Sequence, residues 1–183
     1  MTEAVKKKET IIDRRFGFEV ILVDVPMKEV RGEWVADINA THLRTAVLAG
    51  LTTKPGPLSG AEVRFIRLWM EKTTTEFGQS LGVTHAAVLK WEKRGTEPTG
   101  MNRATEFRLR VLTLQHVPAQ VQAQILAQHR QEPKPGEVGL ESFLGLLEEF
   151  WTEASIESRD DRPLTIPPEL VAQQSLQKVR AHR

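Results

Sequence analysis

The 183-residue chain contains no cysteine, which excludes disulfide bonds and thiolate zinc sites. No apolar stretch approaches the ~20 residues of a membrane-spanning helix, and no signal core follows the basic start, so we expect a soluble cytoplasmic protein without membrane contact. Glycine-rich phosphate loops and nucleophile elbows are absent as well. The histidines form no H-x-x-x-H or HExxH pair; they are His42, His85, His116, His129 and His182. We therefore expect a protein that is not an enzyme and that holds neither a cofactor nor a metal ion.

Charge is nearly balanced, with 25 Lys and Arg against 24 Asp and Glu and a net charge of +1. The distribution of charge is less even. Residues 59–110 hold nine basic and six acidic side chains, whereas residues 131–183 hold six basic and ten acidic ones. A basic middle beside an acidic tail fits a polyanion-binding segment with a different element attached, although ordinary fluctuation in composition gives the same pattern.

The N-terminal part of the chain predicts a flexible basic arm over residues 1–9 and a β-hairpin plus helix over residues 10–54. The segment FEVILVDV is rich in Val and Ile, as strands are. Pro26 interrupts it, and MKEVRGEWVADI predicts a second strand with Gly32 at or near a turn. Asn39 or Thr41 is placed to cap the helix that follows. The segment TTKPGPLSG, with two prolines and two glycines, then predicts a linker.

Residues 58–130 predict a run of short helices. Ser59 is placed to cap the first helix, with Glu62 completing a capping box. The segment TTTEFGQSLGV predicts a second helix that ends at Gly82, because the left-handed backbone of a sharp bend favours a residue without a Cβ. Thr84 is placed to cap a third helix, THAAVLKWEKRG. Further helices are expected over MNRATEFRLRVLTLQHV and AQVQAQILAQHR.

Two short helices joined at a glycine bend have the spacing of a helix-turn-helix. In such a unit the second helix enters the major groove of DNA, with its N-terminal residues against base edges. Ala86 and Ala87 permit close approach to the bases, and His85 and Lys90 offer donors to guanine N7 or O6. The other interpretation is a helix-helix packing surface, where alanines also permit close contact.

The segment TTTEFGQSLGVTHAAVLKWEKRG resembles the XRE family of helix-turn-helix regulators, the group of the Cro and lambdoid phage repressors. The resemblance covers about residues 58–112 and rests on small, apolar and capping positions, namely Thr73, Glu76, Phe77, Gly78, Leu81, Gly82, Val83, Thr84, Val88, Trp91, Glu92 and Gly95. It implies a lambda-repressor-like five-helix DNA-binding domain whose base-reading residues are His85, Ala86 and Lys90.

The same resemblance implies phosphate contacts from five residues, namely Thr74, Thr75, Thr84, Lys93 and Arg94. Thr74 departs from the family pattern, in which Gln is common at this position. Lys93 and Arg94 also suit a solvated helix end, because basic side chains are favoured by the helix dipole there. Both interpretations of these two residues stay open.

The flanking segments KPGPLSGAEVRFIR and EPTGMNRATEFRLRVL make the chain similar to MqsA-type antitoxin-like regulators. Such proteins pair an N-terminal domain with a C-terminal XRE domain, often repress their own operon as dimers, and in some cases neutralise a toxin. The zinc-binding N-terminal cysteines of that group are missing here. The N-terminal hairpin and helix would then be a metal-free substitute, a dimerisation element or a part that packs onto the DNA-binding domain. A toxin or other protein partner stays open.

Residues 138–183 predict a helical C-terminal extension, in which the segment LESFLGLLEEFW is strongly amphipathic. One interpretation makes this helix a dimer or partner contact; the other packs it onto the chain's own core. The residues concerned are Phe143, Leu147, Phe150 and Trp151. Residues 160–168 predict a polar, proline-rich turn, and a last helix is expected over residues 168–179.

Together these patterns predict a mainly α protein, with an XRE-type five-helix domain between a small N-terminal α+β element and a helical C-terminal extension. We expect sequence-specific binding of double-stranded DNA and control of transcription by a homodimeric repressor, on half-sites about 10–10.5 base pairs apart. The alternative function is an adaptor that binds a protein through the C-terminal helix, with DNA binding secondary or lost.

Overall fold

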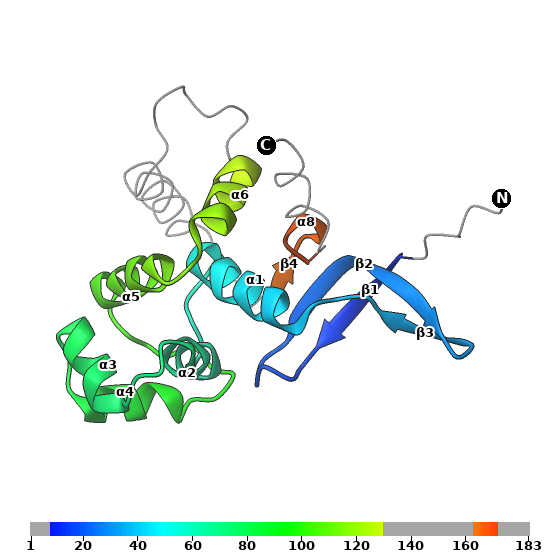
Figure 1. Cartoon of the computed structure of the whole chain (residues 1–183). Coiled ribbons are helices and arrows are strands. Elements are labelled where there is room, and N and C mark those ends of the chain that lie inside the picture. Colours follow the sequence, from blue (N-terminus) through cyan, green and yellow to red (C-terminus); the bar gives the residue numbers. More distant parts are fainter. Residues whose placement is uncertain (1–7, 130–162, 172–183) are drawn as a thin grey trace, which may run out of the picture.

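The computed structural model of the chain describes residues 8–129 and 163–171, which form helices beside a small sheet (Figure 1). The strands are β1 (Lys8–Asp13), β2 (Val20–Val30), β3 (Glu33–Ala36) and β4 (Leu164–Ile166). The helices are α1 (Ala40–Thr53), α2 (Gly60–Trp69), α3 (Thr74–Leu81), α4 (His85–Glu92), α5 (Arg103–Gln115), α6 (Ala119–His129) and α8 (Pro168–Val171). None of the described helices is both long and apolar enough to cross a membrane.

β2 is the central strand of a mixed sheet. β1 and β3 pair with β2 antiparallel, and β4 pairs with it parallel, from Val20 to Leu22. The sheet and the helices together make an α+β fold, so the prediction of a mainly α protein built on a five-helix domain is wrong. The prediction of a helical C-terminal extension is wrong for the same reason, because β4 lies in the segment predicted as its proline-rich turn. A three-residue strand whose partner is near the opposite end of the chain leaves no local pattern to detect.

β2 runs through Pro26, which the sequence analysis placed between two strands. The register with β1 shifts near this point, and Asp24 has a φ of +53°, which together indicate a bulge that accommodates the proline. Beyond Pro26, β2 pairs with β3 in a hairpin that turns at Arg31 and Gly32, as predicted for Gly32. This hairpin extends away from the helices (Figure 1).

α1 lies between the sheet and helices α2–α5 (Figure 1). It packs against β4 so closely that a Cβ on Gly50 would lie 2.8 Å from Cδ1 of Ile166, and it also packs against α5 and α6. The buried apolar side chains form one continuous core from the sheet through α1 into α2–α5, including Val20, Leu22, Leu43, Val47, Leu51, Leu58, Val63, Phe77, Val88, Leu109 and Ile166. This shared core fixes the position of the helix-turn-helix relative to the sheet.

The connection between α1 and α2 is held by buried polar groups. Arg110 of α5 donates hydrogen bonds to the carbonyl oxygens of Lys54 and Gly56, each at 2.7 Å, and to the carboxylate of Glu106 at 2.8 Å. The Lys54 ammonium forms a buried ion pair with Glu62 at 2.7 Å. Any movement of the connection would leave a buried charge without its partner, which is costly, so these bonds hold the connection in one conformation. The segment predicted as a linker therefore lies inside one packed body.

Some predicted elements fall partly or wholly outside the described residues. Lys8 and Glu9, predicted as the end of a basic arm, belong to β1, and the rest of that arm is not described. The residues predicted for dimer or partner contact also lie outside the described residues, namely Phe143, Leu147, Phe150 and Trp151. The C-terminal helix over these residues and its role therefore stay predictions.

Candidate nucleic-acid interface

α2 begins with the predicted cap and supports α4. The Ser59 hydroxyl accepts a hydrogen bond from the Glu62 N–H at 3.3 Å, and the Glu62 carboxylate accepts one from the Ser59 N–H at 2.8 Å, which confirms the capping box. The first turn of α2 lies directly against the end of α4, since a Cβ on Gly60 would be 2.3 Å from the carbonyl oxygen of Trp91. Only glycine permits this approach of the two helices.

α3 and α4 meet at the predicted glycine bend. Gly82 ends α3 in the left-handed conformation, with a φ of 71°. Gly78 lies against the bend, because a Cβ there would be 2.8 Å from the carbonyl oxygen of Val83. The Thr84 hydroxyl then accepts a hydrogen bond from the Ala87 N–H at 3.3 Å, which confirms the predicted cap of α4. Two glycines and one threonine thus set the angle between α3 and α4.

α4 is held through its inner face and through an ion pair. Val88 is fully buried, and Trp91 is only 8% exposed. Glu92, the last residue of α4, accepts two hydrogen bonds from Arg67 of α2, from Nε at 2.6 Å and from Nη2 at 3.0 Å. The third nitrogen of the same guanidinium, Nη1, donates to the carbonyl oxygen of Lys72 at 2.8 Å. α4 is thereby fixed to α2 and to the α2–α3 turn.

The outer face of α4 carries the three residues predicted to read bases. His85, Ala86 and Lys90 are all exposed, and within the described part of the chain no hydrogen bond or ion pair engages the side chains of His85 or Lys90. Leu89 on the same side is 41% exposed. Ala87 differs, because it is half-buried and packs against the core. The interpretation of the alanine pair as a packing surface therefore applies to Ala87, whereas the described residues leave Ala86 uncovered.

Lys93 and Arg94, two of the predicted phosphate contacts, follow α4 and are exposed. The backbone just beyond them is fastened to α2, because the Ala61 N–H donates to the carbonyl oxygen of Gly95 at 2.6 Å. Both basic side chains therefore extend from a fixed backbone at the end of α4.

The threonines predicted as phosphate contacts lie at two helix N-termini with different surroundings. Thr84 is exposed at the start of α4; at the start of α3, Thr75 is exposed and Thr74 half-buried. The Glu76 carboxylate occupies the start of α3, where it accepts hydrogen bonds from the Thr73 N–H at 2.8 Å and the Thr73 hydroxyl at 2.7 Å. These bonds, the backbone one foremost, lower the pKa of Glu76. A phosphate at Thr74 or Thr75 would meet that negative charge, so the start of α4 suits an anion better.

Two exposed arginines on α5 were not singled out by the sequence analysis. Arg108 lies beside the bend, since a Cβ on Gly82 would be 3.2 Å from its Nη1 atom, and Arg103 lies in the first turn of the same helix. Both belong to the basic stretch over residues 59–110, which was the available signal. Arg108 adds positive charge next to α3 and α4.

Across the described residues, no group of three or more His, Asp and Glu side chains is arranged to hold a metal ion. The exposed groups on and around α4 include hydrogen-bond donors, basic side chains and the methyl group of Ala86. Comparison with protein-family models, with curated proteins and with solved structures finds no match for this chain.

Proposed function

We propose that the chain binds double-stranded DNA sequence-specifically and regulates transcription, with α4 as the helix that enters the major groove. The observation that carries this proposal is the outer face of α4, where Ala86 lies exposed beside His85 and Lys90. A single methyl lets the helix backbone approach the base edges and can contact a thymine methyl, and the two neighbouring side chains can donate to purine acceptors. The inner face supports this role, because Val88 is buried and Glu92 is paired with Arg67.

Phosphate contacts would come from the two ends of α4 and from the neighbouring part of α5. Thr84 lies at the N-terminus of α4, where backbone N–H groups favour an anion, and Lys93 and Arg94 follow its C-terminus. Arg108 lies beside the bend and extends the same basic surface. These contacts carry no sequence information, but they set affinity and make it fall as salt rises.

The proposal includes a homodimer on a two-fold site. One helix of eight residues reads few base pairs, so two copies with their α4 helices in successive major grooves, about 10–10.5 base pairs apart, would give adequate specificity. Such a protein would act in the cytoplasm as a repressor, including of its own operon. A toxin-like partner belongs to this proposal only through the resemblance to antitoxin-like regulators.

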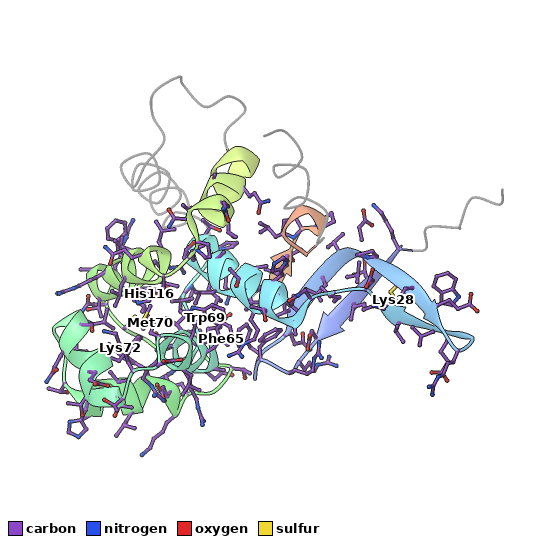
Figure 2. All side chains as sticks on the ribbon, viewed as in Figure 1. Lys28, Phe65, Trp69, Met70, Lys72 and His116 are labelled. Carbon is purple, nitrogen blue, oxygen red and sulfur yellow. The ribbon has the colours of Figure 1, made fainter. Side chains whose placement is uncertain are left out.

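The test begins with selection of random duplex DNA by the purified full-length chain, followed by fluorescence anisotropy with the enriched duplex. Lys90→Ala should cost about 1–3 kcal/mol of binding free energy and relax preference at one base pair. Arg94→Ala should weaken binding to all duplexes and reduce the salt slope by about 1. Lys28→Ala is the control, because Lys28 is an exposed lysine on β2, on the side of the molecule away from α4 (Figure 2).

Enrichment of a two-fold sequence, with losses confined to the α4 variants, supports the proposal. Failure to enrich any sequence contradicts it. So does an affinity for Lys90→Ala and Arg94→Ala equal to that of Lys28→Ala.

A further inference from the structure

A cleft of about 700 Å³ lies between the sheet and the helix-turn-helix. Its lining comes from the β1–β2 turn, from α1 and from α2, and it reaches the end of α4 at Glu92 and Gly95. None of the residues proposed above for DNA contact lines it. The proposed binding of DNA therefore leaves this cleft without a function.

One wall of the cleft is aromatic. Phe65 of α2 meets Phe16 edge-on, with ring centroids 5.6 Å apart, and meets Phe18 at 5.8 Å. Trp69 lies 6.3 Å from Phe65, and both residues lie between α2 and α1 (Figure 2). Leu68, which also lines the cleft, is 53% exposed. Only Phe16 and Phe65 of these rings line the cleft, and their contacts with Phe18 and Trp69 hold them in place as a preformed apolar surface.

Two of the charges that line the cleft are already neutralised. Arg15 forms an ion pair with Asp13 at 2.6 Å. Glu92 forms one with Arg67 at 2.6 Å. Neither Arg15 nor Glu92 therefore sets the charge that a ligand in the cleft would meet.

Two further arginines leave the cleft positive. Arg44 of α1 lies over the ring of Trp69, with its Cζ atom 5.5 Å from the ring centroid, and Arg64 is exposed on α2. Among the residues that the structure describes, no carboxylate pairs with Arg44 or Arg64. Arg44 and Arg64 thus line the same cleft as Phe16 and Phe65, and neither is paired with a carboxylate of the described residues.

We infer that this cleft binds a small organic anion, a carboxylate with an aromatic or aliphatic body. The body lies against Phe16, Phe65 and Leu68, and the acid group meets Arg44 and Arg64. A neutral apolar compound would leave both guanidinium groups unpaired, and an inorganic anion would leave the aromatic wall uncovered. Only an amphipathic anion matches both features, since guanidinium groups recognise carboxylates through charge-assisted hydrogen bonds.

The ligand also acts as an effector of DNA binding, a role that rests on the proposed function. The cleft is lined by Glu92, through which Arg67 holds the end of α4, and by Ala61, whose N–H fastens the loop after α4. A molecule bound in the cleft therefore lies next to the groups that hold α4 in position. Because coupling between two binding sites is reciprocal, DNA must then change the affinity for the ligand by the same factor.

The probe is anilinonaphthalene sulfonate, an aromatic anion that fluoresces when bound, titrated into the full-length chain without DNA. We expect saturable binding that phenylbutyrate displaces and its uncharged amide does not. The double variant R44Q/R64Q should weaken probe binding by about tenfold or more. Leu68→Asp, which adds a carboxylate at an exposed position, should weaken it similarly. Arg31→Gln, an exposed arginine in the β2–β3 turn outside the cleft, is the matched control and should bind the probe like the parent chain.

Far-UV circular dichroism verifies the folding of each variant. Probe binding that resists both R44Q/R64Q and Leu68→Asp overturns the inference, as does equal displacement by phenylbutyrate and its amide. A probe that binds as expected and leaves affinity for the enriched duplex unchanged overturns the effector role alone. A chain that binds the probe but no DNA supports the cleft and contradicts the proposed function, so the two failures are distinguishable.

Discussion

Arg67 of α2 and Glu92 of α4 form a two-point ion pair across 25 residues of sequence, with N–O distances of 2.6 and 3.0 Å. The side chains are only 12% and 11% exposed, so water screens their attraction weakly. The pair includes none of the residues of α4 that we propose to contact DNA. It therefore fixes the proposed DNA-reading helix without occupying its surface.

Arg67→Met should lower the free energy of unfolding by about 3 kcal/mol, because it leaves the Glu92 carboxylate largely buried and without its partner. Urea denaturation followed by circular dichroism measures this loss. Arg64→Met, an exposed arginine one turn earlier on α2, is the matched control and should change stability by less than about 0.5 kcal/mol. Equal stabilities for the two variants would show that the ion pair does not hold α4.

Gly78→Ala should destabilise the chain by about 2 kcal/mol, although alanine favours helices intrinsically by about 1 kcal/mol. The added Cβ would lie 2.8 Å from the carbonyl oxygen of Val83, a backbone atom that moves only if the bend moves. Gln79→Ala, at the exposed neighbouring position, controls for helix propensity and should be nearly neutral. Thermal or urea unfolding compares the two, and a Gly78→Ala variant as stable as Gln79→Ala contradicts the close approach.

Arg110→Lys should lose about 3 kcal/mol of stability, nearly as much as Arg110→Met. The planar guanidinium reaches Lys54, Gly56 and Glu106 together, whereas the single nitrogen of lysine cannot. The measurement is the free energy of unfolding in urea. If Arg110→Lys is instead within about 1 kcal/mol of the parent chain, the positive charge alone holds the α1–α2 connection, and the several hydrogen bonds of the planar guanidinium are not needed.

The Asp13 carboxylate gives the chain a specific acid sensitivity. The Arg15 side chain donates a hydrogen bond to this carboxylate at 2.6 Å, which lowers the pKa of Asp13 from its usual 3.8. Burial of the carboxylate opposes this shift, and a second hydrogen bond from the Arg15 N–H adds to it. Because the folded-state pKa lies below the unfolded one, the stabilisation is fully present above the unfolded pKa and is lost as pH falls through the folded pKa. Asp13→Asn should therefore flatten the decline in stability below about pH 4.

Arg15→Gln, which removes the largest cause of the shift, should partly flatten the same decline and lower stability at neutral pH. Urea midpoints at about pH 6 and about pH 3 give the comparison. An unchanged acid decline in both variants would assign the sensitivity to other carboxylates.

The helix ends and the bend could be predicted because their chemistry is local. Ser59, Thr84 and Gly82 each act on backbone within three or four residues of their own position. Residue type alone therefore indicates their conformation, and the structure confirms all three.

The sheet could not be predicted completely, because its pairing joins distant parts of the chain. β4 has three residues and adds to β2 from the other end of the described sequence. From the sequence, Pro26 predicts the end of a strand, and only the bulge at Asp24 explains why β2 continues through it. In the sequence Arg110 looks like an ordinary basic residue. It can be 1% exposed because it also bonds to carbonyl groups more than 50 residues earlier, which no local pattern reveals.

In the candidate site too, local spacing could be predicted and contacts between separate elements could not. Helical spacing places Ala86 and Lys90 on one face of α4, and the structure leaves both exposed. Spacing alone does not distinguish Ala86 from Ala87, since that difference depends on what packs against α4. It also does not place Arg108 beside Gly82, a contact between separate helices.

The most direct test of the DNA-binding account is the affinity of Ala86→Leu for the enriched duplex, measured by fluorescence anisotropy beside Ala123→Leu, an exposed alanine on α6. Both variants should fold like the parent chain, because each adds its side chain at an exposed position. If α4 lies in the major groove, Ala86→Leu should lose tenfold or more in affinity, or about 1.4 kcal/mol, while Ala123→Leu should bind like the parent. Equal affinities for the two variants would contradict this placement of α4, because nothing would then approach α4 closely enough to require a methyl at residue 86.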